Sequence, residues 1–481
     1  MRISPAYFYC AHNMLESLLM TALTYKEFAE QNPEVCAPVS WTENNDFLVP
    51  FGINIPGKNL FPDGVVKLLP QDFIVEEIAA DGTQYTINYV PPQTTAHIEG
   101  DTVYATLVKF NISTFEAIRQ LVDVLGCTAD QIQYAGIKDQ RAITAQRVSF
   151  RKVSLEAVEK VTSPDFFLKD IASGKGVLQP GMLSGNRFTI LVRTKLAINE
   201  PDAIARLASS LKFVVENGFY NFFYLQRFSS PRYINFRWGR DILLGNYESV
   251  VRSILLDVTQ TETIFFAHIR QELAARWGDW RAMLAHVEET VPMDVFQTER
   301  TILIYLVANP NDFLGVLKQD TRQTQLWVYA FGSKLFNEQL SYFAKKGNVP
   351  TELPTILSPS RDDTATYRHL FEVEGVWPPT WPSLREFPHI QRRRQTVPTT
   401  IPVVFEKVDV VPAGIVLQFT LQKGGYATTF LSHLFNLRGG TLPAGEGEFS
   451  LEDSAVIPQA TRDYFAPVIE MVNLAETTDE A

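Results

Sequence analysis

The sequence predicts an α+β protein in which one domain interrupts another. The segments 64–235 and 395–440 combine strand-like alternation of apolar residues with amphipathic helical stretches. The segment between them has a helical period up to about residue 345 and then becomes rich in proline and tryptophan. We therefore expect a leader of unknown role at 1–60, a discontinuous domain at 61–240 and 396–475, and an inserted domain at 241–395.

The first clear elements follow residue 70. Strands are expected at Asp72–Ile78 and Thr102–Phe110, where apolar and polar residues alternate. A helix is expected to begin after Ser113, because Glu116 three residues later completes a capping-box pattern. Gly126 is the residue type that ends such a helix.

The remaining elements follow from the same two periods. A polar loop, Gly136–Arg141, separates two of the short predicted strands. The other predicted strands are 131–135, 144–150, 186–193, 401–410 and 415–421, and the other predicted helices are 14–29, 202–217 and 427–435.

Composition limits the class of protein. Hydrophobic residues make up 46% and charged residues 20% of the 481 residues, as in ordinary globular proteins. Cys10, Cys36 and Cys127 are too few and too scattered for a disulfide framework or a zinc site, which favours a reducing cytoplasm. No signal peptide is expected, and no apolar run approaches the ~20 residues of a membrane helix, so we predict a cytoplasmic protein.

The net charge of −11 argues against a generally basic RNA-binding protein. It does not exclude RNA binding, because a local positive face is sufficient. The charge favours selective over promiscuous RNA binding.

The loop around Asp139 has the residue types of a reactive site on an anionic polymer. Lys138 and Arg141 would keep the Asp139 carboxylate ionised and attract phosphates, while the carboxylate reaches a sugar or base. A Lys-Asp pair in a turn is more often an ordinary solvated surface, so this loop alone assigns no function.

Three further segments allow two interpretations each. Tyr220–Phe228 is either a base-stacking platform or an aromatic core strand. Lys423–Thr429 is either a phosphate-binding glycine turn before a helix or an ordinary strand-to-helix turn. Arg392–Arg394 either contacts phosphates or forms a solvated linker. The seven histidines show no metal-ligand spacing, and no Walker A, Rossmann or nucleophile-elbow motif occurs.

Six short segments, taken together and in order, carry a family resemblance. They are Gly64–Glu77, Tyr134–Thr144, Leu183–Phe188, Asn221–Phe228, Leu335–Asn337 and Phe419–Thr428. Together they resemble the TruD family of pseudouridine synthases. The central segment, Ala135-Gly136-Ile137-Lys138-Asp139, resembles the family signature whose aspartate is catalytic. Tyr224 stands where the family pattern has a small glycine.

The resemblance implies a fold and a reaction. The fold would be a catalytic domain with a mixed, largely antiparallel sheet flanked by helices, and an inserted α/β domain that forms the second wall of an RNA cleft. The reaction would convert a specific uridine of RNA to pseudouridine without cofactor or metal. In the bacterial branch the target is tRNA at position 13. RNA, most often tRNA, is thus the expected partner, with no membrane and no obligate protein partner.

The resemblance also implies roles for individual residues. Asp139 would be the catalytic carboxylate, and Lys67 would form an ion pair with Asp139 or with a phosphate. Phe223 would pack on the target uracil, and Asn221 would form hydrogen bonds around Asp139.

Gln226 and Arg227 would support the same pocket. The alternatives are a catalytically silent RNA-binding protein or tRNA-folding chaperone on the same scaffold, and an unrelated metabolic enzyme with coincidental fragments. The presence of Lys67, Asp139, Asn221 and Phe223 argues against the silent protein.

Overall fold

A computed structural model describes residues 23–195, 201–356, 361–377, 381–391, 395–440, 453 and 455–478. Its internal contacts divide the chain into two units. The sheet unit comprises Gly57–Asn221, Thr400–Arg438 and Pro443–Ala481, and the helical unit comprises Met1–Pro56, Phe222–Thr399 and Gly439–Leu442. The domain boundaries expected from the sequence remain predictions.

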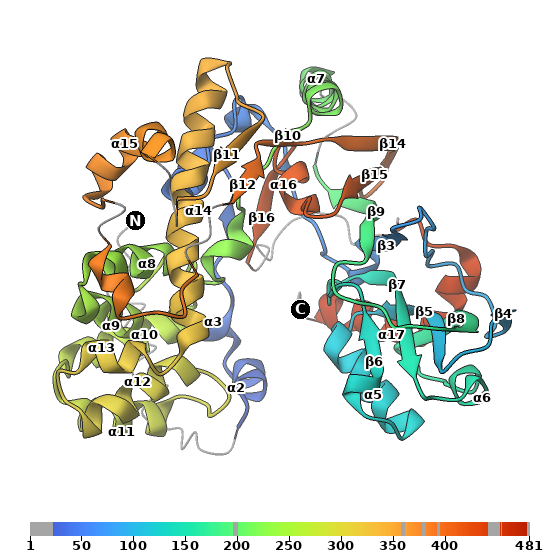
Figure 1. Ribbon diagram of the computed structural model, residues 1–481, viewed down its shortest axis with the longest axis horizontal. Coiled ribbons are helices and arrows are strands. Elements are labelled where there is room, and N and C mark those ends of the chain that lie inside the picture. The colour runs from blue at the N-terminus through green and yellow to red at the C-terminus, as the bar shows by residue number, and fades with distance from the viewer. Residues whose placement is uncertain are drawn as a thin grey trace. The chain divides into compact units, whose positions relative to one another are not determined.

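The sheet unit is built around a nine-stranded sheet with the order β14-β15-β9-β3-β7-β5-β8-β4, with β6 paired to β7 (Figure 1). The pairs β3–β7 and β4–β8 are parallel, and the other neighbours are antiparallel. The predicted α+β class with a mixed, largely antiparallel sheet is therefore confirmed. The strands are β3 Phe73–Ala79, β4 Thr94–His97, β5 Thr102–Phe110, β6 Ile132–Tyr134, β7 Ile143–Arg151, β8 Phe166–Gly174, β9 Leu183–Arg193, β14 Val403–Val411 and β15 Gly414–Gln422.

Short elements complete this unit. β2 Asp63–Gly64 pairs with β16 Asn436–Gly439, and β10 Phe219–Tyr220 pairs with β13 Thr400–Ile401. The helices of this unit are α5 Thr114–Leu125, α6 Leu155–Glu159, α7 Pro201–Asn217, α16 Ala427–Leu431 and α17 Gln459–Thr478.

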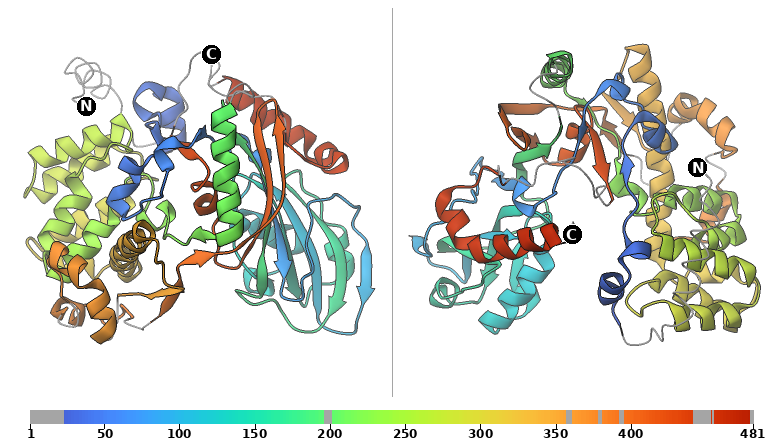
Figure 2. Two further views of the ribbon diagram at one scale, coloured as in Figure 1. Left: turned by 90° about the horizontal axis from the view of Figure 1, so that it is seen from above. Right: turned by 180° about the vertical axis from the view of Figure 1, so that it is seen from behind.

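Alternation along β5 explains why helices cover both faces of this half of the sheet. Val103 and Leu107 pack in one core with residues of α5. Phe110, on the other face, packs in a second core with Phe465 of α17. Successive side chains of a strand point to opposite faces, so one nine-residue strand serves two cores. Figure 2 shows α17, in red, along the sheet.

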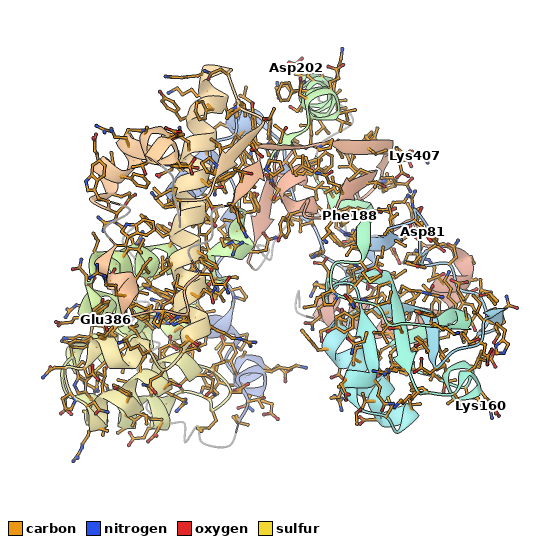
Figure 3. All side chains as sticks on the ribbon, in the orientation of Figure 1. Asp81, Lys160, Phe188, Asp202, Glu386 and Lys407 are labelled. Carbon is orange, nitrogen blue, oxygen red and sulfur yellow. The ribbon has the colours of Figure 1, made fainter. Side chains whose placement is uncertain are left out.

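The other half of the sheet has its own core beneath α7 and α16. Phe188 of β9, labelled in Figure 3, stacks on Phe419 of β15 with ring centroids 5.3 Å apart. Phe430 of α16 packs on Phe419 at 4.3 Å. Ala142, at the end of the loop that carries Asp139, also belongs to this core, so that end of the loop is packed against these strands.

The helical unit consists mainly of helices around one long helix. Figure 1 shows α14 running through this unit beside α8. Its helices are α8 Asn235–Leu244, α9 Tyr247–Leu256, α10 Ile264–Ala275, α11 Trp280–Thr290, α12 Gln297–Ala308, α13 Phe313–Leu317, α14 Thr321–Lys346 and α15 Arg361–Glu374. A small antiparallel sheet of β11 Glu352–Pro354 and β12 Thr396–Pro398 joins them.

Residues 23–56 of the leader belong to the helical unit, and residues 57–60, with η2 Lys58–Leu60, belong to the sheet unit. The elements of residues 23–56 are α2 Tyr25–Gln31, α3 Pro33–Cys36, β1 Trp41–Thr42, α4 Asn45–Leu48 and η1 Val49–Phe51. Residues 14–22 of the helix expected at 14–29 lie outside the described residues, and the helix that the structure shows in this region is α2.

The structure agrees with most predicted elements and corrects others. β5 has the predicted bounds, and Ser113 caps α5 by accepting the Glu116 N–H at 3.0 Å. The capping box also predicted that the Glu116 carboxylate accepts the Ser113 N–H. This part is wrong among the described contacts, because the Glu116 carboxylate binds Arg119 instead, at 2.7 Å. The helix expected at 427–435 ends already at Leu431.

Among the helices within the described ranges, none is long and apolar enough to cross a membrane.

Candidate active site

Asp139 lies on the loop between β6 and β7, in the sheet unit. Its side chain is 41% exposed, and one carboxylate oxygen forms an ion pair with the Lys67 ammonium group. Lys67 also lies over the ring of Phe73, with Nζ 4.1 Å from the centroid. The Lys67 ammonium is thus held between an aromatic face and a carboxylate, and Asp139 keeps an accessible oxygen beside a fixed positive charge.

Side chains from two neighbouring elements hold the backbone of this loop. The Lys138 N–H donates to Thr114 Oγ1 at 3.0 Å, and Gln146 Nε2 donates to the Gly136 carbonyl at 3.0 Å. Thr114 begins α5 and Gln146 lies in β7, and both are fully buried. Buried hydrogen bonds to a loop backbone restrict its conformation, so the position of Asp139 is set by the packed sheet.

Lys109 of β5 binds the backbone of this loop. Its buried ammonium group donates to the Asp139 carbonyl at 2.5 Å and to the Ile112 carbonyl at 2.7 Å. Burial lowers the pKa of Lys109 to about 7; the Asp139 charge opposes this shift, whereas Lys138 and Lys67 add to it. Lys109 is therefore a buried group that titrates near neutral pH next to the candidate catalytic loop.

The expected role of Lys138 is wrong. We expected its side chain to attract phosphates, but it is buried and forms an ion pair with Glu77 of β3 at 2.6 Å. The physical reason is that Lys138 sits on the inward side of the loop, where a buried cation requires a buried anion. The second flanking cation, Arg141, donates to the Lys67 carbonyl at 2.8 Å and so also supports the backbone that carries Lys67.

Asn221 follows β10 directly and is half-buried, at the last position of this part of the sheet unit. The preceding residue, Tyr220, donates its N–H to His433 Nε2 at 3.2 Å. His433 Nδ1 lies 2.7 Å from the Thr429 carbonyl, so the neutral ring with the proton on Nδ1 satisfies both contacts. The pKa of His433 is lowered to about 4, mainly by burial; the hydrogen bond to the Thr429 carbonyl opposes this shift, and nearby Lys58 adds to it. The backbone before Asn221 is thus anchored by a neutral histidine.

The aromatic segment is neither a core strand nor a fully exposed platform. Phe222 and Phe228 are buried, whereas Phe223 is half-buried and Gln226 is exposed. The Phe223 ring packs edge-on against Phe336, with centroids 5.1 Å apart. The Arg227 guanidinium lies over the same ring, with Cζ 5.2 Å from the centroid. Phe223 is therefore a supported aromatic ring with one part accessible.

The predicted site residues fall into two groups. Lys67 and Asp139 are in contact in the sheet unit, which also contains Asn221. Phe223, Gln226 and Arg227 belong to the helical unit, and the Phe223 and Arg227 side chains are in contact there. The substrate-binding and catalytic roles of all six residues remain predictions.

Lys109, Thr114 and Glu77 were not predicted from the sequence as residues that support the site. Lys109 is the one charged residue in an otherwise apolar and small-residue strand, Thr102–Phe110, and this was the available signal. Thr114 was hidden beside the cap residue Ser113. Glu77 gave no signal, because adjacent acids on a strand are usually solvated.

Two other candidate segments gain no support as sites. In the glycine turn, Lys423 donates to the Gly181 carbonyl at 2.9 Å, and the helix that follows, α16, has only five residues. Arg392–Arg394 lies outside the described residues. In the part of the chain that the structure describes, no group of three or more His, Cys, Asp or Glu side chains could hold a metal ion.

The chain is similar to known proteins over most of its length. The family model of tRNA pseudouridine synthase D (TruD) matches residues 62–355. A Methanopyrus kandleri protein named "Probable tRNA pseudouridine synthase D" is 28% identical over 357 residues, which are 69% of this chain and 85% of that protein. The tRNA pseudouridine synthase D of Geobacter metallireducens is 26% identical over 421 residues, which are 78% of this chain and 95% of that protein.

A solved structure has the same fold. A Methanosarcina mazei protein assigned as tRNA pseudouridine synthase D superimposes with a TM-score of 0.64 at 22% identity. The superposition covers 82% of this chain and 98% of that one.

Proposed function

Because this chain belongs to the TruD family of tRNA pseudouridine synthases, we propose that it isomerises one uridine of tRNA, at position 13, to pseudouridine, with Asp139 as the catalytic carboxylate. The reaction breaks the bond between C1′ and N1, turns the freed uracil, and joins C5 to C1′. The proton on C5 is lost and N1 gains one, so the change is an isomerisation and needs no net oxidant or reductant.

The observation that carries this proposal is the setting of Asp139. A partly exposed carboxylate, paired with Lys67, is mounted on a loop whose backbone is held by buried side chains. An ionised carboxylate at a fixed position can attack C1′ or assist departure of uracil through a glycal. In both routes the Lys67 ammonium group offsets the negative charge of the carboxylate and fixes its orientation.

The target base has to leave the RNA stack to reach such a site. We assign the binding of the unstacked uracil to Phe223 and Asn221. Phe223 offers a partly accessible ring for stacking on uracil, and bases stack well on aromatic side chains. Asn221 would supply hydrogen bonds near Asp139, with Gln226 and Arg227 supporting the pocket. In this proposal the reaction uses these side chains and needs no cofactor. We place the reaction in the cytoplasm.

The test is pseudouridine mapping on unmodified tRNA transcripts incubated with purified protein. The wild-type protein is expected to form one new pseudouridine at position 13. Asp139→Asn should lower the single-turnover rate by more than about 10³-fold while leaving the melting temperature and the tRNA affinity unchanged, because only the reacting group is altered. Asp123→Asn is the matched control: Asp123 is an exposed aspartate of α5 in the same unit, and this variant should keep full activity.

Three other outcomes would change the conclusion. Product in total cellular RNA but not in tRNA would assign another RNA substrate to the same chemistry. If no product formed in either pool while the protein bound tRNA, the chain would be a catalytically silent RNA-binding protein. Loss of folding in Asp139→Asn would make Asp139 a structural residue.

A further inference from the structure

Asn337 of α14 has an unusual set of partners for a fully buried asparagine. Its Oδ1 accepts the Phe223 N–H at 2.8 Å, and its Nδ2 donates to the Phe223 carbonyl at 2.8 Å. Nδ2 also donates to the Phe51 carbonyl at 3.0 Å. One side-chain amide therefore binds both polar backbone groups of Phe223, as a neighbouring strand would, and joins them to a backbone group of the leader.

This contact fixes the direction of the Phe223 side chain. A residue whose N–H and C=O are both bound to one rigid amide cannot rotate its backbone without losing two hydrogen bonds to a fully buried side chain. Phe336, the residue before Asn337, packs against the Phe223 ring from α14. Two adjacent helical residues thus hold the backbone and the ring of Phe223.

The leader also binds α14 close to Asn337. One helical turn after Asn337, Ser341 Oγ donates to the Gly52 carbonyl at 2.7 Å and accepts the Asn54 N–H at 2.9 Å. Gly52 has φ +74°, and a Cβ at this position would lie 2.5 Å from the Lys334 carbonyl oxygen. Only glycine therefore fits where the leader backbone contacts α14.

A second contact joins the leader to the aromatic segment itself. The Tyr224 hydroxyl donates to the carboxylate of Glu43, which is 3% exposed. Phe51 stacks on Phe228 with centroids 5.0 Å apart. Tyr224 occupies the position where the family pattern has glycine, and Glu43 lies before residue 62, where the match to the family model begins.

We propose that Asn337 is a positioning residue for Phe223, and that leader residues 43–54 form the back of the same support. The inference rests on the proposed function, in which the Phe223 ring packs on the target uracil. Asn337 does not itself touch the substrate; it sets where the ring stands. A displacement of about 1 Å in such a group costs about 10²-fold in rate.

The test is a double-mutant cycle in single-turnover pseudouridine formation. The variants are Asn337→Ala, Phe223→Ala and the double variant, each with excess protein over tRNA. Asn337→Ala is expected to lower the rate by about 10²-fold with unchanged tRNA affinity, because the ring is misplaced and the tRNA body is still bound. In the Phe223→Ala background the same change should have almost no further effect, because residues that act through one another are not additive.

Two variants control for stability. Asn32→Ala removes another buried asparagine amide of the helical unit, one that donates to the Phe28 carbonyl at 3.0 Å, and it should keep the wild-type rate. Ser341→Ala retains Asn337 and Phe223 but removes the contacts to Gly52 and Asn54. It should lower the rate with unchanged tRNA affinity even if Asn337→Ala fails to fold.

The outcomes separate the two proposals. Active wild-type protein with a rate loss for Asn337→Ala or Ser341→Ala that disappears in the Phe223→Ala background supports the inference. Additive losses would overturn the inference and leave the proposed function intact. Full activity of Phe223→Ala would overturn the inference and the uracil-stacking role of Phe223, and would leave only the isomerisation by Asp139. Wild-type protein without activity on tRNA or on total RNA would overturn both.

Discussion

Asp139 combines an accessible carboxylate with a backbone held from the interior. The residues around it divide this work: Lys67 contacts the carboxylate, while Lys109 and Thr114 contact the main chain on either side. Lys109 of β5 and Lys138 of the loop therefore hold the loop in place, and Lys67 compensates the charge of the carboxylate. A reacting group benefits from this arrangement because preorganisation removes the cost of ordering it during the reaction.

His433 gives a prediction at the residue scale. Its pKa is lowered by burial to about 4 in the folded chain, against about 6.5 in an unfolded one. The unfolded state therefore binds more protons between these values, so the stabilisation is complete above pH 6.5 and is lost as the pH falls towards 4. The loss should reach about 3 kcal/mol at most.

Urea unfolding at several pH values between 7.5 and 4.5 checks this. The comparison is with His433→Asn, whose amide can still donate to the Thr429 carbonyl but does not titrate. The free energy of unfolding of the wild type should fall towards that of the variant as the pH is lowered. Parallel curves for the two proteins would show that His433 has the same pKa in the folded and unfolded states.

At the scale of elements, the β6–β7 loop depends on its neighbours α5, β5, β3 and β7. Thr114 tests this dependence, because its hydroxyl accepts the Lys138 N–H in a fully buried position. Thr114→Val keeps the shape but leaves that N–H without its acceptor, which should cost about 1–3 kcal/mol in the free energy of unfolding. The single-turnover rate should also fall, because the loop carrying Asp139 gains freedom.

A neighbouring threonine supplies the control for this prediction. Thr144 of β7 is equally buried, but its hydroxyl has no hydrogen-bond partner among the described residues. Thr144→Val should therefore be neutral or slightly stabilising in the same urea measurement, with full activity. Equal destabilisation by both substitutions would indicate that volume and packing, and not the hydrogen bond to Lys138, determine the result.

Strands with clean alternation could be predicted from the sequence, and a strand interrupted by charged residues could not. Thr102–Phe110 was predicted with its observed bounds because its alternation matches the two cores on either side. β8 was missed because Lys169 interrupts its apolar run. Lys169 is buried and donates to the Asn88 carbonyl at 2.8 Å, whereas a lysine in a sequence normally indicates exposure.

The contacts within the candidate site were even harder to predict from the sequence than the strands. Lys67 and Asp139 are far apart in the sequence, and no periodicity relates them, so only the family resemblance suggested their ion pair. Lys138 was predicted to face the solvent, but it is buried, because residue type does not show which side of a loop a side chain occupies. The hydrogen bonds of Asn337 to Phe223 were equally inaccessible, since they join a helix to a distant loop.

At the scale of the whole molecule, membership of the TruD family confirms the predicted enzyme class, a pseudouridine synthase and hence an isomerase. The net charge then has a measurable consequence. With −11 overall, long-range attraction to nucleic acid is weak, so binding has to come from local contacts of the right shape.

We therefore predict strong discrimination between structured tRNA and unstructured poly(U). At about 0.15 M salt the affinity for tRNA should exceed that for poly(U) by at least about 10²-fold, because non-specific binding comes almost entirely from phosphate contacts. Fluorescence anisotropy with labelled RNAs, repeated across a range of salt concentrations, measures this. Equal affinities would indicate a basic surface that the net charge conceals.

The order of segments in the sheet unit has a consequence for how the chain is made. A ribosome delivers the strands from β3 to β9 first, then the stretch 222–399 of the helical unit, and only afterwards β15, which pairs with β9, and α17, whose Phe465 packs on Phe110. During that interval β9 has an open edge and one face of β5 is uncovered, which are the conditions under which chains associate wrongly. The growing chain is therefore most prone to wrong association while residues 222–399 are being translated.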